Sequence, residues 1–300
     1  MIIRLANIRN LPVVQYVWRV NTVKRNKILK YLTYLFLLLF MSVSVYAVND
    51  NYPSGSRASG LSNSGVVLKD LWSNYHNQAG LTGIEKLTLG FHYENKYVVS
   101  QYGLHSLALA IPTHRGTIGV SVTFFGYSKY NESKISLAFG KPFGDKFSAG
   151  IQLDLLNIYQ AEDYGNSTTL AVEGGILAEP LQGLLIGAHV YNPTGSYYHT
   201  FETEKVPTIF QIGIGYYFTE KLLIVIETEK DLEQPAVFQG GVEYHVIKSI
   251  YARFGVSTFE MSSYSFGVGF VYKGIKADMA FSQHQILGYT PHVSFSYSFM

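Results

Sequence analysis

Apolar residues alternate with small or polar ones along much of the chain. Between residues 263 and 270, every second side chain is large and apolar, and the side chains between them belong to serine or glycine. The same period of two recurs at residues 117–124, 147–155, 210–218 and 293–299. Because successive side chains of a β-strand point to opposite faces, each stretch is predicted to be a strand with one apolar face.

The composition of the second face separates two β architectures. A soluble β-sandwich also alternates, but its solvent face carries many Lys, Glu and Thr, whereas the second face here is mostly Gly, Ser and Ala. Aromatic residues such as Tyr264 and Tyr272 stand at the ends of apolar stretches, as they do in the interfacial girdles of membrane barrels. The pattern therefore favours a transmembrane β-barrel over a sandwich.

Fourteen strands are predicted after residue 85. Their approximate centres are residues 90, 108, 121, 137, 152, 172, 187, 213, 225, 241, 254, 268, 279 and 296. The links alternate in length, with short ones such as 112–116 and 273–274 and longer ones such as 192–207 and 283–291. Bacterial barrels have an even number of antiparallel strands, short periplasmic turns and longer outer loops. We therefore expect residues 86–300 to form an all-β, fourteen-stranded antiparallel barrel in the outer membrane, with both termini in the periplasm.

The first 47 residues have the features of a signal peptide. Basic residues gather at 24–30, an apolar run follows at 31–43, and cleavage is predicted after Ala47. An uncleaved anchor helix over residues 28–45 is the alternative, because that stretch just reaches the length of a membrane span. Residues 1–23 precede the basic region and do not resemble a signal peptide, which leaves open a translation start further down the chain.

The charge balance changes once this leader is removed. The first 47 residues contain seven Lys and Arg and no Asp or Glu, and the rest contains 16 against 21, so the formal charge falls from +2 to −5. The remainder has no basic excess to attract nucleic acid. The chain also has no Cys, which excludes a disulfide framework and thiolate metal sites.

Residues 48–85 are too irregular to belong to the barrel wall. A barrel of fourteen strands lined by small side chains leaves space that the wall cannot fill. We therefore predict that residues 48–85 form an N-terminal plug segment in the lumen, with a turn at Asn77, Gln78 and Gly80 and with Trp72 anchored on the inner wall. A position at the periplasmic rim is the alternative for Trp72, because tryptophan is enriched at membrane interfaces.

One stretch of the predicted plug resembles a known family. Residues 55–81 contain Arg57, Gly60, the run Gly65-Val66-Val67, Asp70, Trp72 and the sequence Asn77-Gln78-Ala79-Gly80-Leu81. This stretch resembles the N-terminal segment of the FadL-like superfamily, and within it most closely that of the barrels PorV and PorQ. That family usually has Asn-Pro-Ala-Gly at the last motif, so Gln78 stands where proline is expected. Residues 284–299 are similar to the family's final hairpin.

The resemblance implies a fourteen-stranded outer-membrane barrel with its N-terminal segment in the lumen. For FadL it implies uptake of long-chain hydrophobic molecules, and for PorV and PorQ it implies handling of secreted cargo in type IX secretion. Two hypotheses follow. The preferred one is a barrel that binds or passes small, partly hydrophobic molecules through a plugged lumen. The alternative is a non-enzymatic scaffold or cargo-handling barrel whose partners are type IX secretion-system proteins.

Charged residues on the predicted inner face form the candidate site. They are Asp154, Glu173, Glu227, Glu243, Arg253, Lys276 and Asp278. Glu243 and Arg253 stand on consecutive strands joined by a short turn, which allows a cross-strand pair. These charges could form a polar constriction that selects solutes. The simpler interpretation, which we prefer, is a structural ion-pair network that braces the plug or the wall.

No catalytic residue, metal site or cofactor is predicted. The nine His include inward candidates on distant strands, but none forms an H-E-x-x-H motif or a helical pair four residues apart. Serines are abundant, but no G-x-S-x-G nucleophile elbow is present. The pairs Gly174-Gly175 and Gly240-Gly241 precede no predicted helix, so they are not phosphate loops, and we expect them to allow wall bends or a close approach of the plug.

The end of the chain carries aromatic residues on one face. Phe295, Tyr297 and Phe299 alternate with serines, and Met300 follows as an extra residue. This is the aromatic terminus that membrane barrels present during assembly. We therefore expect outer-membrane lipids and the barrel assembly machinery to be partners of this chain.

Overall fold

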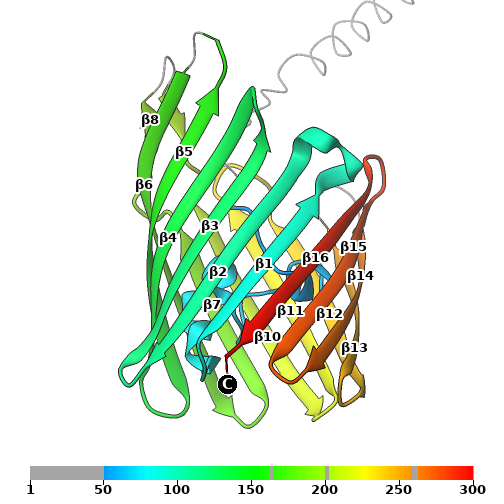
Figure 1. The fold of residues 1–300 in the computed structure, drawn as a ribbon. Coiled ribbons are helices and arrows are strands. Elements are labelled where there is room, and N and C mark those ends of the chain that lie inside the picture. Colours follow the sequence, from blue (N-terminus) through cyan, green and yellow to red (C-terminus); the bar gives the residue numbers. More distant parts are fainter. Residues whose placement is uncertain (1–50, 163–164, 200–202, 259–262, 300) are drawn as a thin grey trace, which may run out of the picture. The chain divides into compact units, whose positions relative to one another are not determined.

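The computed structural model describes residues 51–299 apart from 163–164, 200–202 and 259–262, and most of this part of the chain is strand (Figure 1). The predicted signal peptide, its cleavage site, the alternative anchor helix and the first residues of the predicted plug lie outside the described residues. Among the residues that are described, no helix is long and apolar enough to cross a membrane.

Fourteen strands close into one antiparallel barrel, and they follow one another around it in sequence order. The strands are β1 (Thr88–Asn95), β2 (Gly103–Thr113), β3 (Gly116–Tyr127), β4 (Tyr130–Pro142), β5 (Phe147–Gln160), β6 (Gly165–Leu181), β7 (Leu184–Tyr191), β8 (Tyr197–His199), β9 (Thr203–Lys205), β10 (Ile209–Thr219), β11 (Leu222–Asp231), β12 (Val237–Ile247), β13 (Ile250–Ser257), β14 (Ser263–Tyr272), β15 (Ile275–His284) and β16 (Gly288–Ser298). The last strand pairs with the first, whereas β8 and β9 form a separate hairpin in the connection between β7 and β10. The predicted number of strands is confirmed, and every predicted centre lies within a barrel strand.

The two faces of the wall have the predicted compositions. Ile151 and Val268 point outward and are 66% and 59% exposed, whereas Ser265 points inward and is 1% exposed. The outward side chains along the strands are large and apolar, and such an extensive apolar surface would be unstable in water. In a bilayer the same surface is buried in lipid, and the closed barrel leaves no strand edge unpaired. The wall is therefore that of a membrane-spanning barrel.

The two ends of the barrel differ in their connections. At one end the strands are joined by tight turns, and the chain ends there after β16 (Figure 1). The turn between β14 and β15 consists of Lys273 and Gly274, which both have positive φ, as a two-residue hairpin of type I′ requires. At the other end β1 connects to β2 through two short 3-10 helices, η3 (Lys96–Val98) and η4 (Ser100–Tyr102), and the β8–β9 hairpin projects. We call these the short-turn end and the long-loop end.

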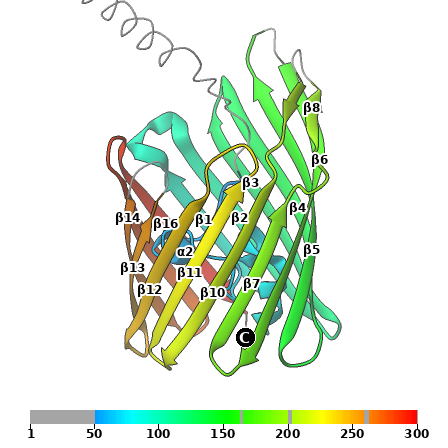
Figure 2. The ribbon, with the colours of Figure 1, turned by 180° about the vertical axis from the view of Figure 1, so that it is seen from behind.

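Residues 51–87, which we call the luminal segment, lie for the most part inside the barrel (Figure 2), and the last few residues before β1 are exposed. The segment contains α2 (Ser56–Ser59), α3 (Ser73–His76) and the 3-10 helix η2 (Gln78–Gly83). It contributes Leu61, Val66 and Val67 to one buried apolar cluster and Leu71 and Trp72 to another. Both clusters also include inward-facing residues of the wall, so the core of the protein lies between segment and wall.

The termini are only partly described. Ser298 pairs with Thr88 at the short-turn end, where a periplasmic C-terminus is expected. Tyr52 stacks on Phe125 with ring centroids 4.6 Å apart, near the long-loop end of β3. The luminal segment therefore runs from the long-loop end towards β1, and the expected periplasmic position of both termini stays a prediction.

Candidate functional site

Glycines on the inner wall let the luminal segment lie directly against the strands. A Cβ added to Gly175 would lie 2.1 Å from Asn77 Oδ1, and one added to Gly241 would lie 2.7 Å from Leu61. The Cα atom of Gly60 is only 3.1 Å from the position of a Cβ on Gly267. These contacts leave no room for a larger side chain, which explains why the second face of the strands is so rich in glycine.

Two arginines and three carboxylates form one network between the segment and the wall. Arg57 of α2 donates to both carboxylate oxygens of Glu243, at 2.9 and 2.7 Å, and to Asp70 at 3.0 Å. Arg253 donates to Glu243 at 2.6 Å and to Asp278 at 2.6 Å. Glu243 and Arg253 therefore form the cross-strand pair that their spacing allowed, and Arg57 connects that pair to the luminal segment.

A second network is centred on the buried Glu173 of β6. Its carboxylate accepts hydrogen bonds from Lys134 at 3.1 Å and from Gln78 at 2.6 Å, and it lies 3.0 Å from Nε2 of His189. The other ring nitrogen of His189 lies 2.9 Å from Gln211 Oε1. Gln78, which stands where the resembling family has proline, thus contributes a direct hydrogen bond between the segment and a buried wall carboxylate.

The remaining charged candidates have different surroundings. Glu227 is buried and accepts a hydrogen bond from the backbone N–H of Val66 at 2.9 Å. Asp154 is buried and accepts one from Gln152 of the same strand at 2.9 Å. Lys276 was predicted to lie among the luminal charges, but its side chain is exposed near the short-turn end of β15. Lys276 is not a member of either network as described above, and the residue of β15 that binds Arg253 is Asp278, two positions further along the strand.

The predicted plug turn is a short 3-10 helix. Asn77 caps it, with its side-chain oxygen accepting from the N–H of Ala79 and its amide donating to the carbonyls of Val66 and Ile176. Gly80 fits tightly, since an added Cβ would lie 2.4 Å from a backbone oxygen. Trp72 is 4% exposed, and its ring lies edge-on to His92 of β1 at 5.7 Å. In the structure Trp72 is thus packed inside the barrel.

A buried apolar cluster lies between these networks and the long-loop end, and sequence reasoning missed it. It consists of Leu156, Ile158, Ala171, Tyr191, Tyr198, Val206 and Ile209. Tyr198 and Val206 come from the β8–β9 connection, and both are fully buried. Lys134 of the second network lies 5.3 Å from the ring centroid of Tyr191. The apolar cluster therefore directly adjoins charged groups, since Leu156 stands opposite Lys134 and Ile158 opposite the buried Glu132. The alternating pattern of β5 could have indicated the cluster, because Leu156 and Ile158 stand at inward positions of that strand.

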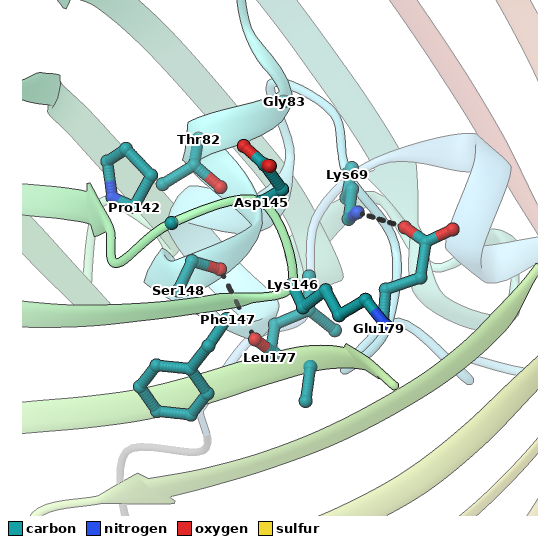
Figure 3. A pocket seen from close by; sticks show the side chains of 12 residues that line it. Lys69, Thr82, Gly83, Pro142, Asp145, Lys146, Phe147, Ser148, Leu177 and Glu179 are labelled. Atoms are coloured by element: carbon teal, nitrogen blue, oxygen red, sulfur yellow. Dashed lines mark hydrogen bonds and ion pairs between the residues drawn. The ribbon is translucent and has the colours of Figure 1, made fainter. Parts of the chain in front are cut away.

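A small pocket opens at the short-turn end between the luminal segment and the wall (Figure 3). Its volume is about 170 Å³, and it is lined by Thr82 and Gly83 of the segment and by the turn between β4 and β5. Lys69 of the segment and Glu179 of β6 form an ion pair of 3.0 Å at this pocket (Figure 3). Because both side chains are about one-third exposed, this ion pair is held far less firmly than the buried networks.

The aromatic residues of the last strand lie on the outer face. Phe295 is directly opposite Phe91 of β1 and is 47% exposed. The rings of Tyr297 and Phe299 meet at 5.0 Å, and the backbone N–H of Phe299 donates to Leu87. These side chains thus stand on the lipid-facing surface beside the seam where the barrel closes.

Comparison with known proteins gives structural matches only. No protein-family model and no curated protein sequence matches the chain. The structure is similar to that of the Pseudomonas putida toluene transporter TodX, with a TM-score of 0.65 and 10% identity over 83% of this chain and 99% of that one. It is also similar to the Ralstonia pickettii toluene transporter TbuX, with a TM-score of 0.63 and 14% identity over 82% and 98% of the two chains. A Pseudomonas aeruginosa FadL homologue matches with a TM-score of 0.60 and 11% identity over 83% and 99%.

These matches define the class of fold. The chain forms a closed fourteen-stranded barrel of the kind seen in FadL-like proteins. At such low identity the likeness shows the fold and does not transfer a substrate. The expectation of a FadL-like barrel is confirmed at the level of the fold, while the finer resemblance to PorV and PorQ stays a prediction.

Proposed function

We propose that the protein is an outer-membrane barrel that binds small, partly hydrophobic molecules and passes them through a lumen closed by its luminal segment. The observation that supports this most directly is the buried apolar cluster in the lumen, which adjoins the charged network of Glu173 and Lys134. A partly hydrophobic molecule entering at the long-loop end would meet the apolar Leu156, Ile158 and Ile209 beside the charged Lys134 and Glu173. The similar barrels TodX and TbuX are toluene transporters, so monoaromatic hydrocarbons are the first compounds to test.

The β8–β9 connection would control entry. Tyr198 is fully buried in the apolar cluster, and Asn192 fixes the returning chain by donating to the carbonyl of Val206 at 2.9 Å. An incoming molecule would have to displace Tyr198 and occupy the apolar surface that it leaves. The free-energy cost of exposing Tyr198 would be offset by burial of the apolar surface of the incoming molecule.

The luminal segment would control exit. Its contacts at the arginine and Glu173 networks are buried, whereas its contact at the pocket of Figure 3 is the partly exposed ion pair between Lys69 and Glu179. Buried charge networks resist rearrangement, because breaking one leaves unpaired charges in a medium of low dielectric constant. We therefore propose that transport rearranges the segment at the short-turn end while the buried networks persist.

The binding step can be tested with a matched pair of substitutions on β5. Ile158 faces the apolar cluster and is 4% exposed, whereas the next residue, Tyr159, faces outward and is 38% exposed. Replacing Ile158 by Asn should weaken toluene binding by roughly tenfold or more, since burial of one large apolar side chain contributes about 1.5–3 kcal/mol. Tyr159→Asn should leave binding within about twofold of wild type. Calorimetry on the purified protein in detergent measures both.

Closure of the lumen can be tested by deletion. Removing residues 48–80 while keeping the first 47 residues should give an inserted barrel that conducts ions in planar bilayers, whereas the intact protein should conduct little. Equal conductance of the two proteins would mean that the segment does not close the lumen. If toluene does not bind the wild type, or binds the wild type and Ile158→Asn equally well, the transport proposal fails. The cargo-handling alternative would then be the one to pursue.

A further inference from the structure

Three side chains that can bind a metal ion meet where the barrel closes. His92 and Glu94 are two residues apart on β1 and therefore share a face, and His292 of β16 stands directly opposite Glu94. All three point into the lumen and are buried, with exposures of 0%, 6% and 5%. One ligand atom from each lies within 4.8 Å of the others. This cluster, which we call the seam triad, lies outside both charge networks described above.

The hydrogen bonding of the seam triad is incomplete. His92 is fully buried, yet within the described chain neither of its ring nitrogens has a hydrogen-bond partner. Its Nε2 atom lies 4.0 Å from Glu94 Oε2, and Nδ1 of His292 lies 3.3 Å from the same oxygen. The contact between His292 and Glu94 leaves the ring nitrogens of His92 unsatisfied. A buried polar group without a partner is costly, and such groups are usually satisfied by a bound water or ion.

We propose that the seam triad binds one divalent transition-metal ion, with Zn²⁺ as the best match. Two imidazole nitrogens and one carboxylate oxygen are a common ligand set for Zn²⁺, with bond lengths of about 2.0–2.2 Å. Tetrahedral ligands at that bond length stand about 3.3 Å apart, so His92 has to approach by roughly one ångström, within the range of side-chain rotation. Neutral imidazoles and one carboxylate carry a single negative charge, which a divalent cation more than balances.

The surroundings of His292 favour metal binding through its Nδ1 atom. Its other ring nitrogen, Nε2, lies 3.0 Å from Ser282 Oγ on β15. A histidine ligand usually donates its second N–H to such a partner, which fixes its tautomer and orientation. Three protein ligands leave the fourth position of the metal open to water. The metal would join the first and last strands of the barrel, and it would hold His92 against Trp72 of the luminal segment.

The site can be tested on full-length protein that is purified without a polyhistidine tag and stripped with a chelator. Zn²⁺ titration should show one tight site per chain, and Co²⁺ should give visible absorption bands typical of low coordination number. His292→Ala and Glu94→Gln should each weaken Zn²⁺ binding by at least about tenfold, as loss of one of three ligands would. The control is His105→Ala, which removes an exposed histidine of the neighbouring strand β2 and should bind like wild type.

The result is decisive whether or not every variant folds. Only variants that keep the heat-modifiable gel migration of the folded barrel are compared, and the Co²⁺ spectrum of the wild type needs no variant. Absence of stoichiometric Zn²⁺ and Co²⁺ binding by the wild type would overturn the proposal. Unchanged affinity in folded His292→Ala and Glu94→Gln would do the same. Metal binding is measured without a hydrocarbon, so its failure leaves the proposed transport function untouched.

Discussion

Arginine at the centre of the outer face of β14 should destabilise the protein strongly. The strand has ten residues, so at a rise of about 3.4 Å per residue and a tilt of about 40° it spans about 26 Å of membrane thickness. That span equals the apolar band of membrane barrels, about 25 Å, and places Val268 close to the bilayer midplane. Val268 is 59% exposed on the outer face, between Ala252 and Met279 of the adjacent strands. The charged group of an arginine at this position would therefore point into the lipid and could not reach the polar lumen.

The expected loss for Val268→Arg is about 2–4 kcal/mol in the free energy of unfolding, or roughly a 30- to 900-fold change in the unfolding constant. Tyr272→Arg is the matched control, because it lies on the same face of the same strand but at its end. Near the interface an arginine should cost only about 0–1 kcal/mol. Denaturant unfolding of both variants in phospholipid vesicles measures the difference. Equal losses at Val268 and Tyr272 would refute the assigned depth, and no loss at either would refute the membrane-facing surface itself.

Three further predictions concern the chain terminus, the fit of the luminal segment and its response to pH. Replacing Phe299 by Asp should sharply reduce the amount of membrane-inserted protein, whereas deleting Met300 should change it little, as fractionation of outer membranes will show. Gly241→Val should prevent the segment from seating, because its Cβ would lie 2.7 Å from Leu61, and should raise conductance in planar bilayers towards that of the deletion variant. Wild-type conductance in Gly241→Val would contradict the close fit. Burial lowers the pKa of His76 from 6.5 to about 4, so the seated segment favours the neutral ring, and its binding should weaken as pH falls from about 6.5 towards 4. His76→Gln should lack this part of the pH dependence of conductance.

The barrel wall could be predicted because the pattern that defines each strand and turn lies within that strand's or turn's own sequence. Each strand shows its outer face as large apolar residues at every second position, and each tight turn interrupts the pattern with Gly or charged residues. The pair of Glu243 and Arg253 could also be predicted, since a single tight turn joins their strands. Prediction of the fold required no contacts between residues distant in the sequence, apart from the pairing of the first and last strands that closes the barrel.

The contacts of the luminal segment could not be predicted in the same way. Arg57 and Glu243 are 186 positions apart, and no periodicity connects an irregular segment to a particular wall residue. Alternation places Lys276 on the same face of the strand as Asp278, but it does not show that this position near the end of β15 is exposed. The seam triad could not be predicted for another reason. Motifs such as H-E-x-x-H bring ligands together through short spacing in the sequence, whereas His92 and His292 become neighbours only because the last strand pairs with the first.

The luminal segment precedes every strand that it contacts, and this has a consequence for the order of assembly. Ser56 donates to the hydroxyl of Ser294, which lies 238 positions later, and Arg57 contacts a residue of β12. During export the segment therefore emerges first, whereas the strands that carry these two partners, β12 and β16, emerge near the end. Its charged and polar groups stay hydrated until the late strands arrive, and only then does dehydration favour docking. A time-resolved probe placed beside Ser56 and Arg57 should accordingly report the arrival of the late strands, whereas Trp72, which packs against β1 and β2, should respond earlier.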